Sequence, residues 1–251
     1  MKKLLDCAMD IGELMLLSGA EVHRVEDTMG RICRSFGATR VDVFIITSSM
    51  VTTIHCPNGN VHTQTRRIKS LGTDFHKLDQ LNKLSRKICT EKMEAEEISA
   101  EVARIRESRV YPLWLQCVAY AVIAAAFTVI FGGGWQQTLV SLVIGGLLRF
   151  VVLFADRVVK NMIFSKFVSS TFLTAMAFLA LFLHMIPKVD EVIIGNIMLL
   201  IQGLGFTNAL RDLFTGDSVS GILRCLEAVL SAVAIAAGYF LFVLVIGGAA
   251  V

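Results

Sequence analysis

Charged residues and prolines are scarce in this sequence. Charged residues make up 18% of the 251 positions against 55% for hydrophobic ones, and there are three prolines. The scarcity is uneven, because residues 1–110 hold 17 of the 24 Lys and Arg and 15 of the 21 Asp and Glu, which leaves 13 charges for the other 141 positions. This partition predicts a polar domain followed by a membrane domain, and it disfavours a secreted protein, a wholly soluble enzyme and a disordered chain.

Several chemical signatures are also missing. The net charge of +3 is small and the basic residues are interleaved with acids, so the basic surface typical of nucleic-acid binding is absent. The six cysteines form no CxxC pair and no zinc-type spacing, which predicts free thiols in a reducing compartment. No GxSxG, HExxH, P-loop or GxGxxG motif occurs, so neither nucleotide-driven transport nor familiar hydrolysis has support, and no cofactor is expected.

Residues 1–110 are predicted to form a cytoplasmic α+β domain. Acidic residues at positions 6, 10 and 13 interrupt the segment in which a signal peptide would need its apolar region. Hydrophobic periodicity divides the domain into helices over 4–17, 22–36, about 75–88 and 92–109, and at least three antiparallel strands within 41–65. The turn sequence Pro57-Asn58-Gly59-Asn60 indicates a hairpin between two of the strands.

Residues 111–251 are predicted to form an all-α polytopic membrane domain. A helix needs about 20 residues to cross a bilayer, and five apolar stretches of about that length are placed at 114–131, 136–155, 167–186, 192–210 and 225–247. Lys and Arg gather in the connections near 156–166 and 211–224, whereas the other two connections carry only Lys188. The positive-inside rule then predicts a protein of the cytoplasmic (inner) membrane with its N-terminus inside and its C-terminus outside.

Five spans are an odd number for a transporter, since many secondary transporters are built from repeated halves. No internal repeat is visible in this sequence. We therefore expect a second subunit, either a copy of this chain or a different membrane protein, to supply further helices in the bilayer.

Polar residues close to the apolar stretches are the main candidates for function, because ionisable groups in a membrane are expensive. The connection from 208 to 221 packs opposite charges, glycines and hydroxyls between two predicted spans. It continues into a helical stripe of polar and small residues that would face protein or water: Ser220, Arg224, Glu227, Ser231 and Gly238. The candidates for a substrate or proton pathway are Arg149, Gln202, Asn208, Arg211, Asp212, Asp217, Ser220, Arg224 and Glu227. The structural alternative is a capped helix start with Asp217 near the N-terminus and an Arg224–Glu227 pair.

Arg149 and Gln202 each have a functional and a structural interpretation. Arg149 lies inside the second predicted span, where its guanidinium could meet a substrate carboxylate or snorkel to the interface. Gln202 precedes Gly203-Leu204-Gly205. Such a segment could unwind and offer backbone groups to a ligand, or it could pack closely against a neighbouring helix.

Two groups in the predicted cytoplasmic domain also qualify. Glu21, Arg24 and Glu26 crowd the start of the second helix, either as a functional cluster or as charge matching on a surface helix. A two-residue turn at Asn58-Gly59 would place His55 opposite His62. Two imidazoles without a third ligand do not make a specific metal site, so no metal is expected.

Two stretches of the sequence resemble the threonine/serine exporter family. The first is Leu17-Ser-Gly-Ala-Glu-Val-His-Arg-Val-Glu26, followed by Gly37 and the strand-rich region. The second resembles the most distinctive membrane motif of that family and comprises Asn208-Ala209-Leu210-Arg211-Asp212, Gly216-Asp217, Ser220-Gly221, Arg224 and Glu227-Ala228. The stretches occur in the family's order, and together they extend the resemblance over essentially the whole chain.

This resemblance implies an exporter of small metabolites that depends on the proton-motive force and has about ten spans in full-length members. With five predicted spans, the chain looks like the larger subunit of the split form, in which a separate small membrane protein supplies the rest. Split members are linked to dicarboxylate export. The family commonly has Pro-Gly where this sequence has Gln202-Gly203, which puts a proline-induced break in the fourth span in doubt.

The leading hypothesis is a subunit of a secondary exporter of small carboxylates, such as threonine, serine or succinate, and not an enzyme. The substrate carboxylate would be attracted by arginines, namely Arg149, Arg211 and Arg224. Acidic residues would pair with these arginines and exchange protons, the candidates being Asp212, Asp217 or Glu227. The alternative is a membrane-tethered sensor or regulator whose soluble domain is the working part. A third hypothesis is a membrane-bound hydrolase that uses the acidic cluster of the second helix.

Overall fold

The chain folds into two compact units. The computed structural model describes residues 2–68, 72–91, 93–108, 111–159 and 161–249. Unit 1 consists of Met1–Val110 and Leu204–Cys225, and unit 2 consists of Tyr111–Gly203 and Leu226–Val251. A short segment from the second half of the chain therefore belongs with the N-terminal residues.

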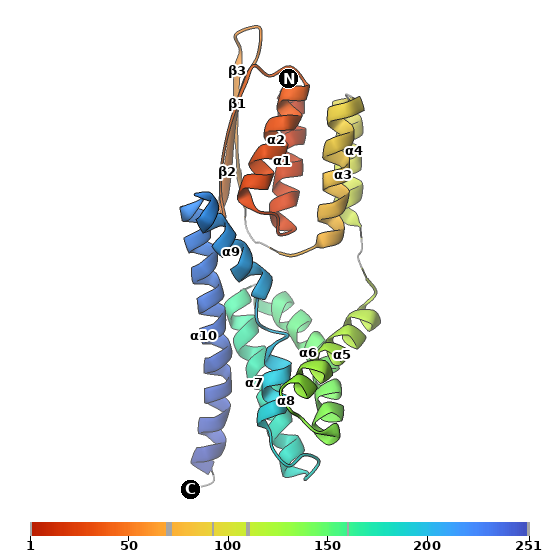
Figure 1. Cartoon of the computed structure of the whole chain (residues 1–251), viewed down its shortest axis with the longest axis vertical. Helices are drawn as coiled ribbons and strands as arrows, with labels where there is room; N and C mark the ends of the chain where they lie inside the picture. The colour runs from red at the N-terminus through yellow and green to blue at the C-terminus, as the bar shows by residue number, and fades with distance from the viewer. Residues whose placement is uncertain (1, 69–71, 92, 109–110, 160, 250–251) are drawn as a thin grey trace. The chain divides into compact units, whose positions relative to one another are not determined.

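Unit 1 combines helices with one small sheet (Figure 1). In chain order its elements are α1 (Lys2–Leu17), α2 (Val22–Ser35), β1 (Arg40–Ile46), β2 (Ser49–His55), β3 (Val61–Arg67), α3 (Phe75–Glu91), α4 (Ala95–Glu107), most of α9 (Gly203–Thr215) and the start of α10 (Ser218–Ala249). Within the described residues, the helices and antiparallel strands predicted for the N-terminal part of the chain are confirmed, with boundaries close to those expected from periodicity. The predicted ends of the last helix, 92 and 109, lie outside the described residues.

The sheet is antiparallel in the order β1-β2-β3, and its register corrects one prediction. His55 does not face His62, because His55 pairs with Val61 and His62 pairs with Ile54. Side chains alternate between the two faces of a strand, so the imidazoles lie on opposite faces of the sheet. The two histidines cannot share a ligand across the hairpin.

The length of the hairpin loop explains the difference in register. The Cys56 N–H donates to the Asn60 carbonyl at 2.8 Å, which closes a three-residue loop where a two-residue turn was predicted. Gly59 takes the left-handed conformation of such loops, with φ +82°. One additional loop residue shifts the pairing by one position, which a composition-based turn signal does not reveal.

The core of unit 1 lies between the sheet and its helices. Alternate residues of β2 are buried, and apolar side chains at three-and-four spacing are buried on the helices. The largest fully buried side chains are Leu5, Met9, Ile11, Met15, Leu16, Met29, Ile32, Met50, Ile54, Leu81, Ile88 and Ile98. Each such burial contributes about 1.5–3 kcal/mol relative to exposure, and the two helices that flank the α1–α2 turn are both anchored in this core.

The regular secondary structure of unit 2 is helical throughout its described residues. Its helices are α5 (Leu113–Ile130), α6 (Trp135–Val159), α7 (Met162–Phe182), α8 (Asp190–Ile197) and the part of α10 from Leu226 onward. Within the described residues, four helices are long and apolar enough to cross a membrane: α5, α6, α7 and Ser218–Val245 of α10. These correspond to four of the five predicted spans.

The predicted fourth span, 192–210, is not confirmed, because it is not one helix. α8 ends at Ile197 after eight residues, and α9 begins at Gly203. Eight residues rise about 12 Å, far less than the roughly 30 Å of the hydrocarbon layer. The irregular segment between α8 and α9 contains Gln202, where the sequence allowed the helix to unwind. α9 itself is amphipathic and has buried Asp212 among its residues.

Helices α5 and α6 approach closely through glycine. A Cβ on Gly145 would lie 2.6 Å from the Ala124 Cβ and 2.8 Å from the Tyr120 carbonyl oxygen. The neighbouring Gly146 has more room, because its Cβ would lie 3.7 Å from the Ala121 Cβ. Lipid tails are as apolar as helix surfaces, so the hydrophobic effect does not drive helices together inside a membrane. Small residues at the contact instead allow two helix backbones to pack tightly.

A buried polar network joins three helices of unit 2. The Thr128 and Ser141 hydroxyls are 2.6 Å apart, and the Asn196 amide donates to the Ser141 oxygen at 3.1 Å. Asn196 also donates to the Val192 carbonyl at 2.9 Å. These bonds connect α5, α6 and α8, so we interpret Asn196 as a packing residue of the short helix.

The two glycines of α6 give a matched test of this packing. Gly145→Ala is expected to lower the thermal stability of the protein in detergent, because the added methyl group meets backbone and costs about 1–3 kcal/mol. Gly146→Ala is the control and should be neutral or slightly stabilising, since its methyl group fits and alanine favours the helix. Equal melting temperatures for the two variants would contradict the close α5–α6 contact.

Candidate functional site

The turn between α1 and α2 presents two backbone acceptors. α1 ends in a Schellman motif, in which the Gly19 N–H donates to the Leu16 carbonyl at 3.1 Å and the Ala20 N–H donates to the Met15 carbonyl at 3.0 Å. Gly19 has φ +91°, a conformation that favours glycine. The carbonyl oxygens of Gly19 and Ala20 lie beyond the end of α1, where no helical N–H takes them, so they can accept hydrogen bonds from other elements.

The corner between α9 and α10 has the same construction. The Asp217 N–H donates to the Asp212 carbonyl at 2.9 Å across Gly216, which has φ +96°. A Cβ on Gly221 would lie 2.9 Å from the Ala209 carbonyl oxygen, so the start of α10 packs directly on α9. This close packing brings acidic and basic side chains of the two helices together.

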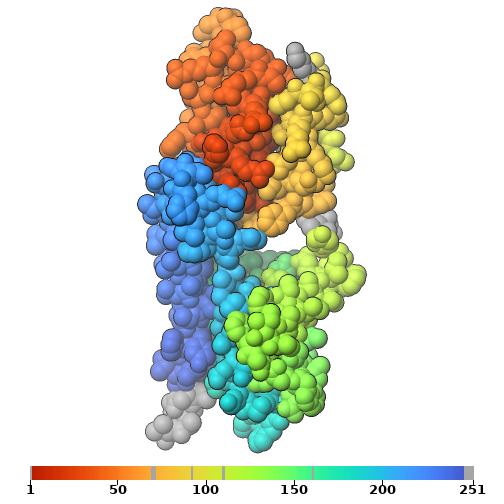
Figure 2. Space-filling view, in the orientation of Figure 1, coloured from red at the N-terminus to blue at the C-terminus, as the bar shows by residue number. Residues whose placement is uncertain are grey.

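The α1–α2 turn and the α9–α10 corner are neighbours within unit 1 (Figures 1 and 2), and polar contacts join them. The Asn208 amide donates to the Gly19 carbonyl at 3.2 Å, and the Arg224 guanidinium donates to the Ala20 carbonyl at 3.2 Å. A third contact is an ion pair between Arg211 and Glu21. We call the residues that make this junction the clasp: Gly19, Ala20, Glu21, Asn208, Arg211, Asp212 and Arg224.

A buried ion pair lies at the centre of the clasp. The Arg224 Nη1 is 3.3 Å from the Asp212 Oδ2, and the two side chains are 7% and 1% exposed. Among the described residues, neither Asp212 oxygen nor the Arg224 Nε has a partner at hydrogen-bonding geometry. Buried charges without full hydrogen bonding are costly and weakly stabilising, so this pair points to function more than to stability.

Burial also changes the acidity of two carboxyl groups near the clasp. Desolvation raises the pKa of Asp212, against the lowering effects of Arg224 and the nearby Val22 N–H, and the charges of Asp217 and Glu21 raise it further. Desolvation likewise raises the pKa of Glu26 on α2. The nearby Asp217 charge adds to the rise for Glu26. The charge of Asp217 therefore raises the pKa of both Asp212 and Glu26.

The sequence cluster at the start of α2 divides between two faces of the helix. Glu21 contacts Arg211, and the Glu26 carboxylate accepts from the Ile45 N–H of β1 at 3.1 Å. Arg24 instead lines a groove between α2 and α3. The three residues that were considered together as one candidate cluster thus do not form one site.

The stripe predicted along α10 is mostly buried. In unit 1, Ser220 and Arg224 are buried against the rest of that unit. In unit 2, Ser231 is buried, and Gly238 lies so close to α7 that its Cβ would be 2.5 Å from the Phe167 carbonyl oxygen. Glu227 differs from the others because it is exposed.

Arg149 and Gln202 belong to unit 2 and make local contacts there. The Arg149 guanidinium donates to the Gln116 side-chain oxygen, with Nε at 2.9 Å, and lies over the Tyr120 ring. The Gln202 amide lies 2.6 Å from the Met162 sulfur, in the irregular segment between α8 and α9. Neither residue belongs to the unit that contains the clasp, so both remain separate candidates.

Sequence reasoning missed the backbone part of the site. It selected Asn208, Arg211, Asp212 and Arg224 from charge and spacing but did not assign a role to the Gly19 and Ala20 carbonyls. The usable signal was the Ser18-Gly19 helix stop, which predicts a Schellman motif and therefore unpaired carbonyls after it. What those carbonyls contact depends on a segment in the last quarter of the chain.

Four helices among the described residues are long and apolar enough to cross a membrane, which supports a multi-pass membrane protein. The chain belongs to the family described as "Putative threonine/serine exporter", which it matches over residues 6–247. The family resemblance seen in the sequence is thus confirmed.

Relatives of two lengths match the chain. It is 26% identical to the threonine/serine exporter of Corynebacterium glutamicum over 244 residues, which cover 94% of this chain and 50% of that protein. It is 24% identical to the "Probable succinate transporter subunit YjjP" of Klebsiella aerogenes over 214 residues, which cover 84% of this chain and 81% of that protein. The chain spans about half the length of the threonine/serine exporters it matches. No solved structure matches it.

A double-mutant cycle tests the buried pair. Asp212→Leu and Arg224→Met should each destabilise unit 1 by about 3–5 kcal/mol, because each leaves one buried charge unpaired. The double variant should recover most of the loss, since it removes both charges at similar volume. Unfolding in detergent provides the measurement, with Asp79→Asn, which breaks an exposed ion pair with Lys83, as the control. Additive losses in the double variant would contradict the pairing.

The raised pKa of Asp212 predicts a pH dependence. In the folded protein the Asp212 carboxyl stays protonated at pH values above its ordinary pKa of 3.8. Between pH 3.8 and the raised pKa, the folded protein therefore binds more protons than the unfolded chain. The contribution of Asp212 to stability should therefore fall as the pH rises from 3.8 through its raised pKa. The infrared band of the protonated carboxyl should persist into this interval and disappear in Asp212→Asn but not in Asp79→Asn. A band that titrates as in an ordinary aspartate would contradict the prediction.

Proposed function

We propose that this chain is a subunit of a secondary exporter that moves small carboxylate metabolites, threonine and serine or a dicarboxylate such as succinate, out of the cell. The proposed driving force is the proton-motive force. The observation that carries the proposal is the buried Asp212–Arg224 pair, in a family whose relatives are named as a threonine/serine exporter and a succinate transporter subunit. We propose no catalytic role.

The proposed chemistry assigns complementary roles to the charged residues of the clasp. Arg211 and Arg224 would attract the substrate carboxylate, because a guanidinium matches the geometry of carboxylate oxygens. Asp212 would gain and lose a proton beside Arg224. Protonation of Asp212 and binding of the anion would be coupled, because the Asp212 charge lies 3.3 Å from Arg224 and changes the binding free energy of an anion there. A bound anion would change the proton affinity of Asp212 by the same amount. Glu26 and Asp217 are the neighbouring acids through which the proton would pass.

We further propose that the substrate site is completed by a second membrane subunit. The support comes from lengths, because the chain matches half of a threonine/serine exporter but four-fifths of a protein named as a transporter subunit. A second copy of this chain is the alternative source of further helices. The proposed location is the cytoplasmic membrane with residues 1–110 inside, supported by the Lys and Arg residues of the connections.

Flux measurements in vesicles test the function directly. Vesicles containing this chain, alone or together with a candidate small membrane protein as the second subunit, are loaded with labelled threonine, serine or succinate. We expect efflux of at least one substrate that needs the second protein and collapses when a protonophore is added. Flux that ignores the gradient, or no flux of any of the three with both proteins present, would refute the proposal. Protease added outside right-side-out vesicles should leave residues 1–110 intact if the orientation is correct.

Substitutions in the clasp separate the exporter from a membrane-tethered sensor. Arg211→Gln and Asp212→Asn should each lower the flux about 5- to 150-fold, the range of coupling free energies of about 1–3 kcal/mol. Asp79→Asn should retain the flux, because its ion pair with Lys83 is exposed and lies on α3. Retained flux in the two clasp variants, with folding intact, would favour a working role for the soluble part of the chain.

A further inference from the structure

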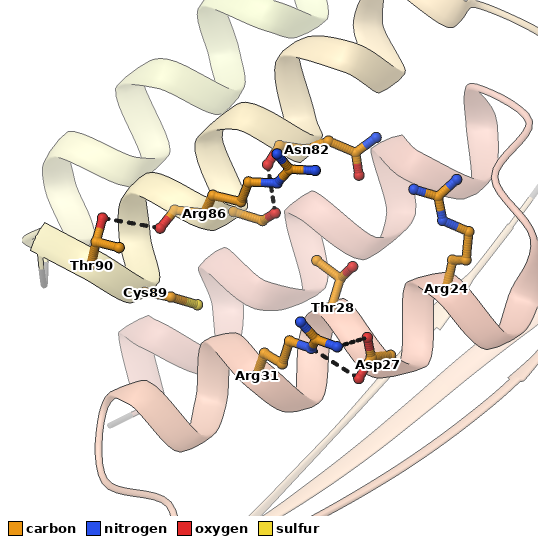
Figure 3. A pocket seen from close by; sticks show the side chains of 9 residues that line it. Arg24, Asp27, Thr28, Arg31, Asn82, Arg86, Cys89 and Thr90 are labelled. Atoms are coloured by element: carbon orange, nitrogen blue, oxygen red, sulfur yellow. Dashed lines mark hydrogen bonds and ion pairs between the residues drawn. The ribbon is translucent and has the colours of Figure 1, made fainter.

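A polar groove lies between α2 and α3, away from the residues of the clasp. It has a volume of about 540 Å³, within the range of small-molecule sites. Figure 3 shows side chains of both helices projecting toward one another across it. The helices touch through their apolar faces, which bury Met29 and Leu81, while their polar edges stay apart. The groove is thus a consequence of how two amphipathic helices pack.

The lining of the groove carries an excess of positive charge. Three guanidinium groups, those of Arg24, Arg31 and Arg86, face one carboxylate, that of Asp27. Asp27 is already engaged by Arg31 at 2.9 Å, one turn along α2. Among the described residues, no carboxylate pairs with Arg24 or Arg86. The groove therefore holds two guanidinium groups, one from each helix, that lack a counter-charge.

Two neutral donors also line the groove. In the described part of the chain, the Thr28 hydroxyl and the Asn82 amide have no side-chain hydrogen bond of their own, and both line the groove. Arginine, hydroxyl and amide donors from opposite sides match an anion with several oxygens, since guanidinium groups bind carboxylate and phosphate through paired hydrogen bonds.

We propose that the α2–α3 groove binds a small multivalent anion through Arg24 and Arg86, with Thr28 and Asn82 as neutral donors. The chemical class is a metabolite with two or more carboxylate or phosphate groups. The site is distinct from the clasp and does not depend on the proposed transport reaction. Its position suits a regulatory ligand, because α2 begins at Val22, next to the Glu21 that pairs with Arg211. An anion that ties α2 to α3 would fix the helix that carries one side of the clasp.

Binding to the purified chain in detergent tests the proposal. Succinate, citrate and inorganic phosphate are titrated separately by calorimetry, at low and at moderate salt. We expect saturable binding of at least one probe, weakened by salt because the contacts are charged. A preference for phosphate would assign a phosphate ligand, and a preference for the di- or tricarboxylate would assign a carboxylate ligand. The absence of saturable binding by all three probes would overturn the proposal.

Matched variants locate the binding. Arg24→Gln with Arg86→Gln should weaken it by at least about tenfold, because two charge-assisted contacts are lost. The control, Arg34→Gln with Lys87→Gln, removes the same charge from the same two helices outside the groove and should bind as the wild type does. Arg24 and Arg86 are exposed, so the fold should tolerate their replacement. Each single substitution provides the test if the double variant does not fold.

A clasp variant separates this proposal from the transport function. Arg211→Gln should keep the groove's affinity for the probe while it lowers flux, whereas the Arg24 and Arg86 variants should lose the affinity. Binding that is lost in Arg211→Gln and kept in the groove variants would place the anion at the clasp and overturn the groove site. Binding unaffected by either change would also overturn it.

Discussion

The ion pair between Asp212 and Arg224 is the interaction on which the rest of the site depends. Two charges buried to this degree would be too costly without one another, and a further donor of Arg224 is used on the backbone of the α1–α2 turn. The pair therefore needs three separate pieces of chain: α9, the start of α10 and a turn near residue 20. It gives the N-terminal helices a structural reason to associate with a segment from the far end of the sequence.

Glycine makes this association possible at both ends. Gly19 and Gly216 take left-handed conformations that end α1 and α9. At each helix end the chain turns sharply, which brings the residues after the helix to the junction. Gly221 lets α10 start against the backbone of α9, which sets the distance between their charged side chains. The glycines thus determine where the buried charges of Asp212 and Arg224 lie, and these charges determine which ligands the site can bind.

Helix α2 connects the two polar regions of unit 1. Its buried face packs in the core, Glu21 and Glu26 are directed to the clasp and to β1, and Arg24 lines the groove toward α3. Residues on different sides of one helix therefore contribute to the clasp, to the contact with β1 and to the groove.

The sequence by itself determined the polar and apolar halves, the α+β character of the N-terminal half, four of the long apolar helices and the charged residues at 208–224, because periodicity, composition and charge are local properties. Only the tertiary structure decided between an unwound and a continuous helix at Gln202, and it alone decided that His55 faces Val61 and that Arg24 separates from Glu21. Each of these depends on loop length, helix amphipathicity or partners distant in the chain. The carbonyls of Gly19 and Ala20 became part of the site for the same reason, since a backbone oxygen carries no residue signature until something folds against it.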